Sequence, residues 1–315
     1  MQSPWGELDV SDAHVHFLSR GFFTALAAQK SAGAGAGSER ETVESIVAKL
    51  GWQAPPEAHV LAAVWAYELD HHGVRRAALI ASVPGDEQSV ATAVGACSDR
   101  FYGYFMVDPT APDAAERVRT AIAGGRLHCI CLFPAMHRYS IQDERVRLVL
   151  EAAAAGPGAA VFVHCGVLTV GVRGKLGLPS PFDMRFSNPI DLHAVALAFP
   201  KLRFIIPHFG AGYFREALML CDLCPNVYLD TSSSNHWMRY QHEEISLAHV
   251  FRRALDVAGP QRLLFGTDSS FFPRGWHAAI FEEQVQALGQ IGVSAADAHR
   301  IFGANLEGLM ARPTS

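Results

Sequence analysis

Eight short runs of apolar, β-prone residues alternate along this chain with Ala-rich segments of helical period. Several of the runs are almost continuously apolar, which is typical of strands buried on both faces of a parallel sheet. The runs are residues 8–10, 77–83, 101–107, 128–133, 160–163, 202–206, 227–229 and 263–265. Amphipathic segments between them include residues 114–123, 143–155, 189–198 and 245–257. A strand–helix alternation repeated to eight predicts a closed (β/α)8 barrel, the TIM-barrel architecture, rather than an open sheet.

Length and composition fit one domain of this kind. The chain has 315 residues, of which 50% are hydrophobic, and single α/β barrels commonly reach this length. We therefore expect one barrel domain over residues 1–315. The formal net charge is −5, and Lys and Arg are neither in excess nor clustered. This charge argues against nucleic acid as a partner and favours a small-molecule substrate.

Signals for export or membrane insertion are not found in the sequence. The N-terminus lacks the basic region followed by an apolar region that marks a secretory signal. The longest stretch without a formal charge, residues 152–172, contains Gly and Pro and suits a turn and a buried strand better than a membrane span. The six cysteines are scattered, without the spacing of a disulfide scaffold. We expect a cytoplasmic protein with no membrane partner.

The connection between the first two predicted strands, residues 17–73, is far longer than a usual strand-to-helix link. It holds the low-complexity tract Ser31-Ala-Gly-Ala-Gly-Ala-Gly37, followed by a helical stretch at residues 39–50. An insertion at this end of the barrel could form a lid, supply a dimer contact or be a plain mobile excursion. The sequence leaves these three interpretations open.

Polar residues collect where the predicted strands end. His14, His164, His208, Asp230 and Asp268 all lie at or just past the C-terminal end of a strand. In a (β/α)8 barrel that face carries the active site. We therefore expect these five side chains to converge on one mouth.

His14 and His16 are separated by one residue, so on a strand both side chains point to the same face. Two adjacent imidazoles can bind one divalent ion, usually zinc, with ring nitrogens about 2.0–2.1 Å from it. Alone, the pair would be read more simply as two histidines that cap a strand. The histidines at 164 and 208 and the carboxylate at 268, each ending another strand, favour the metal site.

Seven short motifs, spread from the first strand to the last helix, form a specific combination. They are Asp12-Ala-His-Val-His16, His164-Cys-Gly166, Asn188-Pro-Ile-Asp-Leu192, Phe199-Pro-Lys-Leu-Arg-Phe-Ile-Ile-Pro-His-Phe-Gly210, Pro225-Asn-Val-Tyr-Leu-Asp-Thr-Ser232, Phe265-Gly-Thr-Asp268 and Ile301-Phe-Gly-Ala-Asn305. The combination resembles the amidohydrolase superfamily, specifically the amidohydrolase-2 branch. That branch includes aminocarboxymuconate-semialdehyde decarboxylase, resorcylate decarboxylases and several lactone hydrolases.

The resemblance implies a set of metal ligands. His14, His16, His164 and Asp268 would hold one divalent ion, most simply Zn²⁺, with Mn²⁺ as the alternative. His208 would stand beside the metal-bound water or the substrate without necessarily being a ligand.

The resemblance also bears on metal count and assembly. Many superfamily members carry a carbamylated Lys at the end of the fourth strand, where it bridges two metal ions. Here that run reads Cys129-Ile-Cys131-Leu-Phe-Pro134, with no Lys, so one ion is expected rather than two. Relatives in this branch are often dimers, so the analogy makes a homodimer one candidate assembly, and the sequence leaves the oligomeric state open.

Two reactions fit such a site. In a hydrolase, zinc lowers the pKa of bound water to about 7, and the hydroxide attacks an ester, lactone or amide carbonyl. Asp268 would take the proton and pass it to the leaving group, and His208 would polarise the carbonyl. In the alternative, a decarboxylase of an aromatic or unsaturated acid, Asp268 or His208 would mediate protonation of the carbon that loses carbon dioxide. Hydrolysis is expected because it is the commoner task of the superfamily. A metal-free binding module is the third hypothesis, disfavoured because every expected ligand is present.

Residues in the loops are candidates for substrate contacts. His236 and Trp237 follow the seventh strand, and Arg173 and Arg274 follow the fifth and the eighth, where a guanidinium could clamp a carboxylate. Each has a plain alternative as a solvated surface residue. Asp230 either orients a ligand histidine by a hydrogen bond or caps a helix. A pair of cations aimed at a second carboxylate would favour decarboxylation over hydrolysis.

Overall fold

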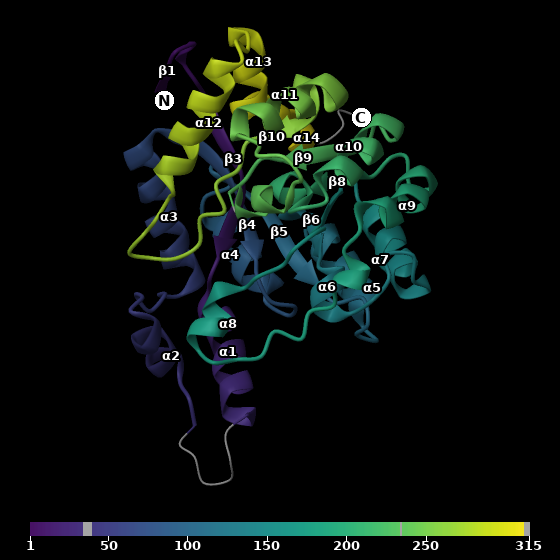
Figure 1. Cartoon of the computed structure of the whole chain (residues 1–315). Coiled ribbons are helices and arrows are strands. Elements are labelled where there is room, and N and C mark those ends of the chain that lie inside the picture. Colours follow the sequence, from purple (N-terminus) through teal and green to yellow (C-terminus); the bar gives the residue numbers. More distant parts are fainter. Residues whose placement is uncertain (34–39, 234, 312–315) are drawn as a thin grey trace.

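Eight parallel strands form one sheet in the order in which they occur along the chain, and this sheet curves into a barrel (Figure 1). The computed structural model describes residues 1–33, 40–233 and 235–311. The strands are β3 (Val10–Phe17), β4 (Val74–Ala81), β5 (Phe101–Val107), β6 (Leu127–Leu132), β7 (Ala160–Val163), β8 (Arg203–Ile206), β9 (Val227–Asp230) and β10 (Leu263–Leu264). A short antiparallel hairpin, β1 (Gln2–Ser3) with β2 (Gly6–Glu7), precedes them.

The barrel closes between its first and last strands. Ala13 N donates to Phe265 O at 2.8 Å, and His16 N donates to Ser269 O at 2.7 Å. A parallel bridge pairs Val15 with Ser269, just beyond the end of β10. The predicted (β/α)8 barrel is therefore confirmed.

Helices follow or precede the strands around the outside of the barrel (Figure 1). They are α3 (Ala58–His72), α4 (Glu87–Ala96), α5 (Ala114–Ala123), α7 (Glu144–Ala154), α9 (His193–Ala198), α10 (Phe214–Leu223), α11 (Leu247–Ala258) and α12 (Ala278–Gln290). Shorter helices are α6 (Pro134–His137), α8 (Gly171–Lys175), α13 (Ala295–His299) and α14 (Asn305–Met310). The predicted helical segment 189–198 divides into a 3-10 turn at Pro189–Leu192 and α9. In the described part of the chain, no helix is long and apolar enough to cross a membrane.

The first strand differs from its prediction. Residues 8–10 were expected to form it, whereas β3 begins at Val10 and continues to Phe17. The apolar pattern breaks at Ser11 and Asp12, which are buried polar residues with hydrogen-bond partners of their own. A buried strand can carry such residues when their polar atoms are paired, and for this reason the pattern alone set the strand too early.

Two apolar layers surround the sheet. Alternate residues of the strands fill the barrel interior, among them Ile80, Tyr104, Cys129 and Cys131. The opposite faces pack against the helices in a larger cluster. Cys129 and Cys131 are fully buried in the interior layer, so the end of β6 carries no side chain of the kind that bridges two metals.

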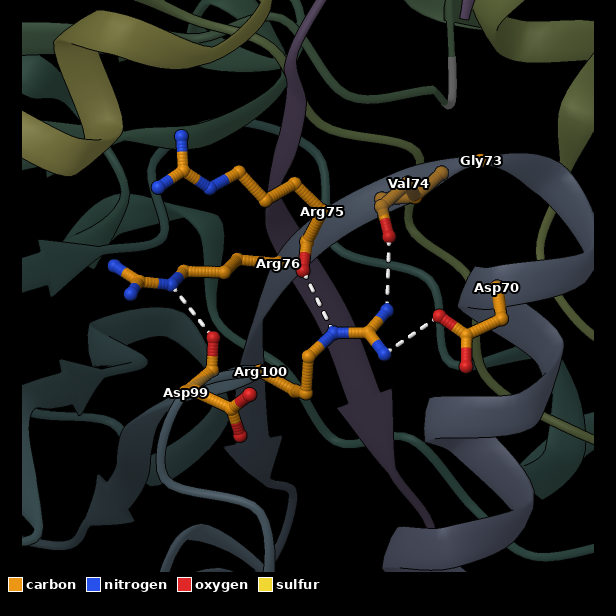
Figure 2. Close-up of a pocket in the computed structure, with 7 residues that line it drawn as sticks. All are labelled: Asp70, Gly73, Val74, Arg75, Arg76, Asp99 and Arg100. Carbon is orange, nitrogen blue, oxygen red and sulfur yellow. Dashed lines mark hydrogen bonds and ion pairs between the residues drawn. The ribbon is translucent and has the colours of Figure 1, made fainter.

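The N-terminal end of the barrel is braced by arginines (Figure 2). Arg100 donates to Arg75 O at 2.8 Å, to Val74 O at 3.0 Å and to Asp70 Oδ1 at 2.7 Å. Arg76 Nε donates to Asp99 O at 2.8 Å. The hollow between these side chains, about 400 Å³, lies where β4 and β5 begin. Active sites in this fold lie at the opposite end, so we assign these arginines a bracing role.

The described part of the long connection, residues 17–33 and 40–73, contains three helices. α3 takes the place of the first barrel helix, whereas α1 (Arg20–Ala32) and α2 (Val43–Leu50) gather with α8 at the end of the barrel where β3 ends (Figure 1). Their apolar side chains form one cluster with the segment after β7: Phe22, Phe23, Leu26, Val43, Ile46, Val47, Leu50, Val172 and Leu176. Residues 34–37 of the low-complexity tract lie outside the described residues. The lid and dimer interpretations of this connection stay predictions.

Candidate active site

Three predicted ligands form a compact group at the C-terminal end of the barrel. His14 and His16 extend from β3, and Asp268 lies in the loop after β10. His14 Nε2 is 3.3 Å from His16 Nε2, and Asp268 Oδ1 is 3.6 Å and 3.2 Å from the same two nitrogens. Among the described residues these three form a group that could hold a metal ion, with ligand atoms within 4.8 Å of one another.

Asp230 orients the ring of His14. Its Oδ2 accepts a hydrogen bond from His14 Nδ1 at 2.6 Å, and its Oδ1 accepts from the backbone N–H of Ser232 at 2.7 Å. With Nδ1 as donor, the lone pair of His14 Nε2 faces His16 and Asp268. Burial lowers the pKa of His14, but the charge and hydrogen bond of Asp230 outweigh burial and raise it to about 9. The surroundings of His14 therefore favour a positive charge, which either a proton or a metal ion can supply.

His16 is oriented by Ser82, which follows β4. His16 Nδ1 lies 2.7 Å from Ser82 Oγ, and Ser82 Oγ itself donates to Ile80 O at 3.0 Å. Because the hydroxyl hydrogen is used on Ile80, the hydroxyl oxygen accepts from His16 Nδ1. As in His14, Nε2 of His16 therefore carries no hydrogen and has a free lone pair. Sequence reasoning missed Ser82; its only signal was a hydroxyl at the end of a predicted strand.

Asp268 occupies a left-handed backbone conformation, with φ at 60°. Its N–H donates to His14 O at 3.0 Å, which fixes the loop against β3. Burial raises the pKa of Asp268, but the contact with His16 at 3.2 Å and the nearby imidazoles of His14 and His208 hold it below the usual range. Asp268 is therefore an ionised carboxylate at neutral pH, able to accept a proton.

Asp12, the first residue of the Asp12-Ala-His-Val-His16 motif, is a brace and not part of the compact group. It accepts four hydrogen bonds: from His14 N at 2.9 Å, Thr267 N at 3.1 Å, Thr267 Oγ1 at 2.6 Å and Trp276 Nε1 at 2.8 Å. Burial raises its pKa to about 6, against the opposing effect of these donors. Asp12 thereby ties β3 to the loop that carries Asp268.

Gly266 gives the site the room it needs. A Cβ at this position would lie 2.6 Å from Asp230 Oδ1 and 3.0 Å from the Cβ of His14. Any larger residue would displace the carboxylate that orients His14. The glycine of the Phe265-Gly-Thr-Asp268 motif is thus explained by close approach to its neighbours.

His208 lies beside the compact group. Its ring centre is 5.1 Å from that of His14, and its Nδ1 is 3.0 Å from Ser232 Oγ. The backbone is left-handed from His208 (φ 55°) to Ala211 (φ 43°), a conformation that bulky residues rarely adopt outside functional sites. Burial lowers the pKa of His208, so its imidazole is neutral at neutral pH.

His164 ends β7 and faces the same cavity, yet it lies outside the compact group of three. Its ring centre is 5.5 Å from that of His208, and it stacks on Phe133 with ring centres 5.4 Å apart. Its Nδ1 is buried and has no hydrogen-bond partner among the described residues. Burial lowers the pKa of His164 well below its ordinary value.

A cavity of about 440 Å³ opens above these side chains, with His14, His16, His164, His208 and Asp268 in its lining. The rest of the described lining is mostly apolar, with Met106, Phe133, Met136, Leu168 and Val170 among the lining residues. Four of the five side chains predicted to converge on the mouth therefore line one cavity, and the fifth, Asp230, is buried behind His14.

The predicted substrate-contact residues divide into two groups. His236 and Trp237 line the cavity. Arg173 and Arg274 do not: Arg173 donates to Pro179 O and Gln29 Oε1, and Arg274 donates to Asp268 O and Ser270 Oγ. Arg239, which sequence reasoning missed, is the only Lys or Arg among the described lining residues.

The insertion supplies one wall of the cavity. Leu18 and Phe22, at the start of the insertion, and Trp52, just after α2, line it. Trp52 stacks on Phe271 with ring centres 4.1 Å apart and planes at 9°. Lys175 lies 5.6 Å from the Trp52 ring and Arg274 lies 4.6 Å from the Phe271 ring, one cation on each of the two stacked rings.

A family model for amidohydrolases matches residues 11–305, from β3 to the last helix. The chain belongs to the amidohydrolase family. The family resemblance carried by the seven motifs is thereby confirmed.

This amidohydrolase is similar in sequence to Protein fluG of Emericella nidulans, with 33% identity over 87 residues. The match covers 28% of this chain and 10% of that protein, so the chain spans a small part of its length. In structure it is similar to 5-carboxyvanillate decarboxylase from Sphingomonas paucimobilis, with a TM-score of 0.64, 16% identity and coverage of 96% and 99% of the two chains. A probable 2-pyrone-4,6-dicarboxylic acid hydrolase from Acinetobacter baumannii has a TM-score of 0.60, 13% identity and the same coverage. At these identities the likeness shows the fold and not the reaction.

The family is metal-dependent, and two further structures of this fold contain different ions. An amidohydrolase from Burkholderia multivorans contains zinc (TM-score 0.55, 18% identity, covering 96% of this chain and 99% of that one). The 5-carboxyvanillate decarboxylase of Novosphingobium aromaticivorans contains manganese (TM-score 0.58, 15% identity, 98% and 99% coverage). The residues of this amidohydrolase fit such an ion, because two imidazoles with their Nδ1 hydrogens engaged elsewhere face one ionised carboxylate.

Replacing Ser82 tests how the site is built. We expect Ser82→Ala to lower the affinity for zinc by about tenfold to a hundredfold, since His16 loses the partner that holds its ring and tautomer. A competition titration against a chelator of known affinity measures this. Ser270→Ala is the matched control, because Ser270 also lines the cavity but bonds Arg274 rather than a histidine. Equal zinc affinity in the two variants would contradict the orienting role of Ser82.

Proposed function

We propose that this amidohydrolase is a hydrolase of a small carboxylic ester, lactone or amide that works with one divalent metal ion. His14, His16 and Asp268 would hold the ion, with His164 as a fourth ligand from the facing wall of the cavity. Zinc is the metal we propose, because imidazole and carboxylate ligands suit it. We propose one ion and not two, because no Lys follows β6 to bridge a second one. Manganese is the alternative.

The proposed chemistry divides between the ion and the chain. A divalent ion supplies Lewis acidity and lowers the pKa of water to about 7. Asp268, ionised at neutral pH, accepts the proton of the attacking water and returns it to the leaving group. His208, neutral and on the other side of His14, donates a hydrogen bond to the carbonyl oxygen as negative charge develops there. The apolar wall of the cavity excludes bulk water and contacts the body of the substrate.

One observation carries the choice of hydrolysis: the described lining holds one guanidinium and no pair of cations. Decarboxylation of a dicarboxylic acid would need the ion for the carboxylate that leaves and a cationic pair for the one that stays. Arg173 and Arg274, the two candidates for such a pair, are not among the described lining residues. Arg173 is bonded to Pro179 O, and Arg274 to Asp268 O and Ser270 Oγ. Arg239 supports decarboxylation as the second candidate, because it can pair with a single carboxylate.

A substrate panel tests the proposal. Zinc-loaded enzyme is incubated with lactones, aryl esters and hydroxybenzoate-type acids, and acid release and carbon dioxide are both followed. We expect acid release from at least one lactone or ester and no carbon dioxide from the acids. The same enzyme stripped by a chelator is the blank. Carbon dioxide as the sole product would contradict hydrolysis.

A further inference from the structure

Ser232 lies between two histidines of the site. It follows β9, is fully buried, and its Oγ is 3.0 Å from Nδ1 of His14 and 3.0 Å from Nδ1 of His208. Its backbone N–H donates to Asp230 Oδ1 at 2.7 Å, which fixes its position. A hydroxyl has one hydrogen to donate, so which of the two histidines receives it decides where each ring carries its own hydrogen.

The contact between His14 and Asp230 shows which nitrogen of His14 carries the hydrogen. His14 Nδ1 and Asp230 Oδ2 are 2.6 Å apart, and two acceptors would repel at that distance, so a hydrogen lies on His14 Nδ1. That nitrogen cannot accept the hydrogen of Ser232. In the described part of the chain, the other acceptor within hydrogen-bond distance of Ser232 Oγ is His208 Nδ1.

We infer that the Ser232 hydroxyl donates to Nδ1 of His208 and so fixes the neutral imidazole in the tautomer that carries its hydrogen on Nε2. Nδ1 is turned toward Ser232, whose hydroxyl oxygen at 3.0 Å is the nearer partner and whose backbone oxygen lies at 3.5 Å, the limit of a hydrogen bond. His208 also lines the cavity. The edge with Nε2 therefore meets the substrate as a hydrogen-bond donor. His208 is thus suited to stabilise an oxyanion and not to remove a proton, which leaves Asp268 as the base. Ser232 is a positioning residue in this scheme, acting through His208.

The same arrangement links the two histidines to one carboxylate. Asp230 fixes the hydrogen of His14 directly and the position of Ser232 through its backbone. His14 is thereby left with a free lone pair on Nε2, and His208 with a hydrogen there. Two neighbouring imidazoles receive opposite hydrogen-bonding roles from one aspartate and one serine.

Nitrogen NMR of zinc-loaded enzyme labelled with ¹⁵N-histidine tests the inference. The His208 signals are assigned by their loss in His208→Gln. In the unsubstituted enzyme we expect Nδ1 of His208 to resonate as an unprotonated nitrogen and Nε2 as a protonated one. In Ser232→Ala both signals should move toward each other as the second tautomer becomes populated, and kcat/KM should fall about tenfold, the effect of one hydrogen bond. Ser232→Thr should restore both.

Ser233→Ala is the matched control, since Ser233 is the next serine of the same run and should change neither quantity. A protonated Nδ1 in the unsubstituted enzyme overturns the inference, whether or not Ser232→Ala folds. Unchanged His208 signals in Ser232→Ala overturn it as well, even where zinc content and activity fall. The catalytic consequence rests on the proposed function, but the tautomer does not. Enzyme that hydrolyses no ester yet shows the expected signals would refute the function alone.

Discussion

Asp268→Asn is expected to lower kcat/KM by about a thousandfold or more while the protein remains folded. An amide cannot accept the proton that Asp268 is placed to take, and general-base catalysis contributes about 10²–10⁴-fold. The substitution also removes the negative charge that lies 3.2 Å from His16 Nε2. Steady-state kinetics at saturating zinc separates the loss of the base from a loss of metal affinity.

Asp183→Asn serves as the control for this experiment. Asp183 is a carboxylate outside the cavity lining that pairs with Arg185, so the same chemical change there should leave kcat/KM unaltered. Thermal unfolding of both variants checks that the barrel is intact. An Asp268→Asn enzyme that keeps most of its activity at saturating zinc would refute the role of Asp268 as base.

Removal of the metal is the second large effect that we expect. Enzyme dialysed against a chelator should lose turnover, and zinc or manganese should restore it at about one ion per chain. Calcium should not restore it, because calcium prefers six or more oxygen ligands over imidazole nitrogen. An ion that binds only the folded state also stabilises it, by about 2.7 kcal/mol when its concentration is a hundred times its dissociation constant. Thermal unfolding with and without zinc measures that gain.

Metal content decides between an enzyme of this kind and a binding module. Protein purified without a chelator should contain zinc or manganese by elemental analysis. Below about 0.2 equivalents per chain, with no thermal gain on adding either ion, the metal-dependent proposal would fail. The remaining hypothesis would then be a barrel that binds a ligand without metal chemistry.

The sequence was sufficient to predict the fold and much of the cavity floor, by which we mean the histidines and Asp268 at the ends of the strands. A closed parallel barrel brings all strand ends to one mouth, so His14, His164, His208 and Asp268 could be placed together without any knowledge of contacts. The hydrophobic periodicity of the sequence was enough to locate most of the strands and helices. It misplaced the start of β3, where Ser11 and Asp12 are polar yet buried.

The residues that orient the floor could not be found in this way. Ser82 lies 66 residues from His16, and Ser232 lies 218 residues from His14. A serine after a strand is common, and only the folded structure shows which hydroxyl meets which nitrogen. Arg239 was missed for a related reason: several arginines follow the strands, and loop geometry selects the one that lines the cavity. Periodicity carries no signal for loop geometry.

The wall formed by Leu18, Phe22 and Trp52 has a different origin from the floor beneath it. The histidines and Asp268 of the site come from the ends of four strands, β3, β7, β8 and β10, whereas these three wall residues come from one continuous piece of chain. The described residues between Leu18 and Trp52 form no strand of the sheet. They meet the barrel through side-chain contacts such as the Trp52–Phe271 stack. Substitutions in this piece of chain can reshape the space offered to a substrate while the reacting groups keep their places. Within one barrel, substrate specificity and catalytic chemistry can therefore diverge at different rates during evolution.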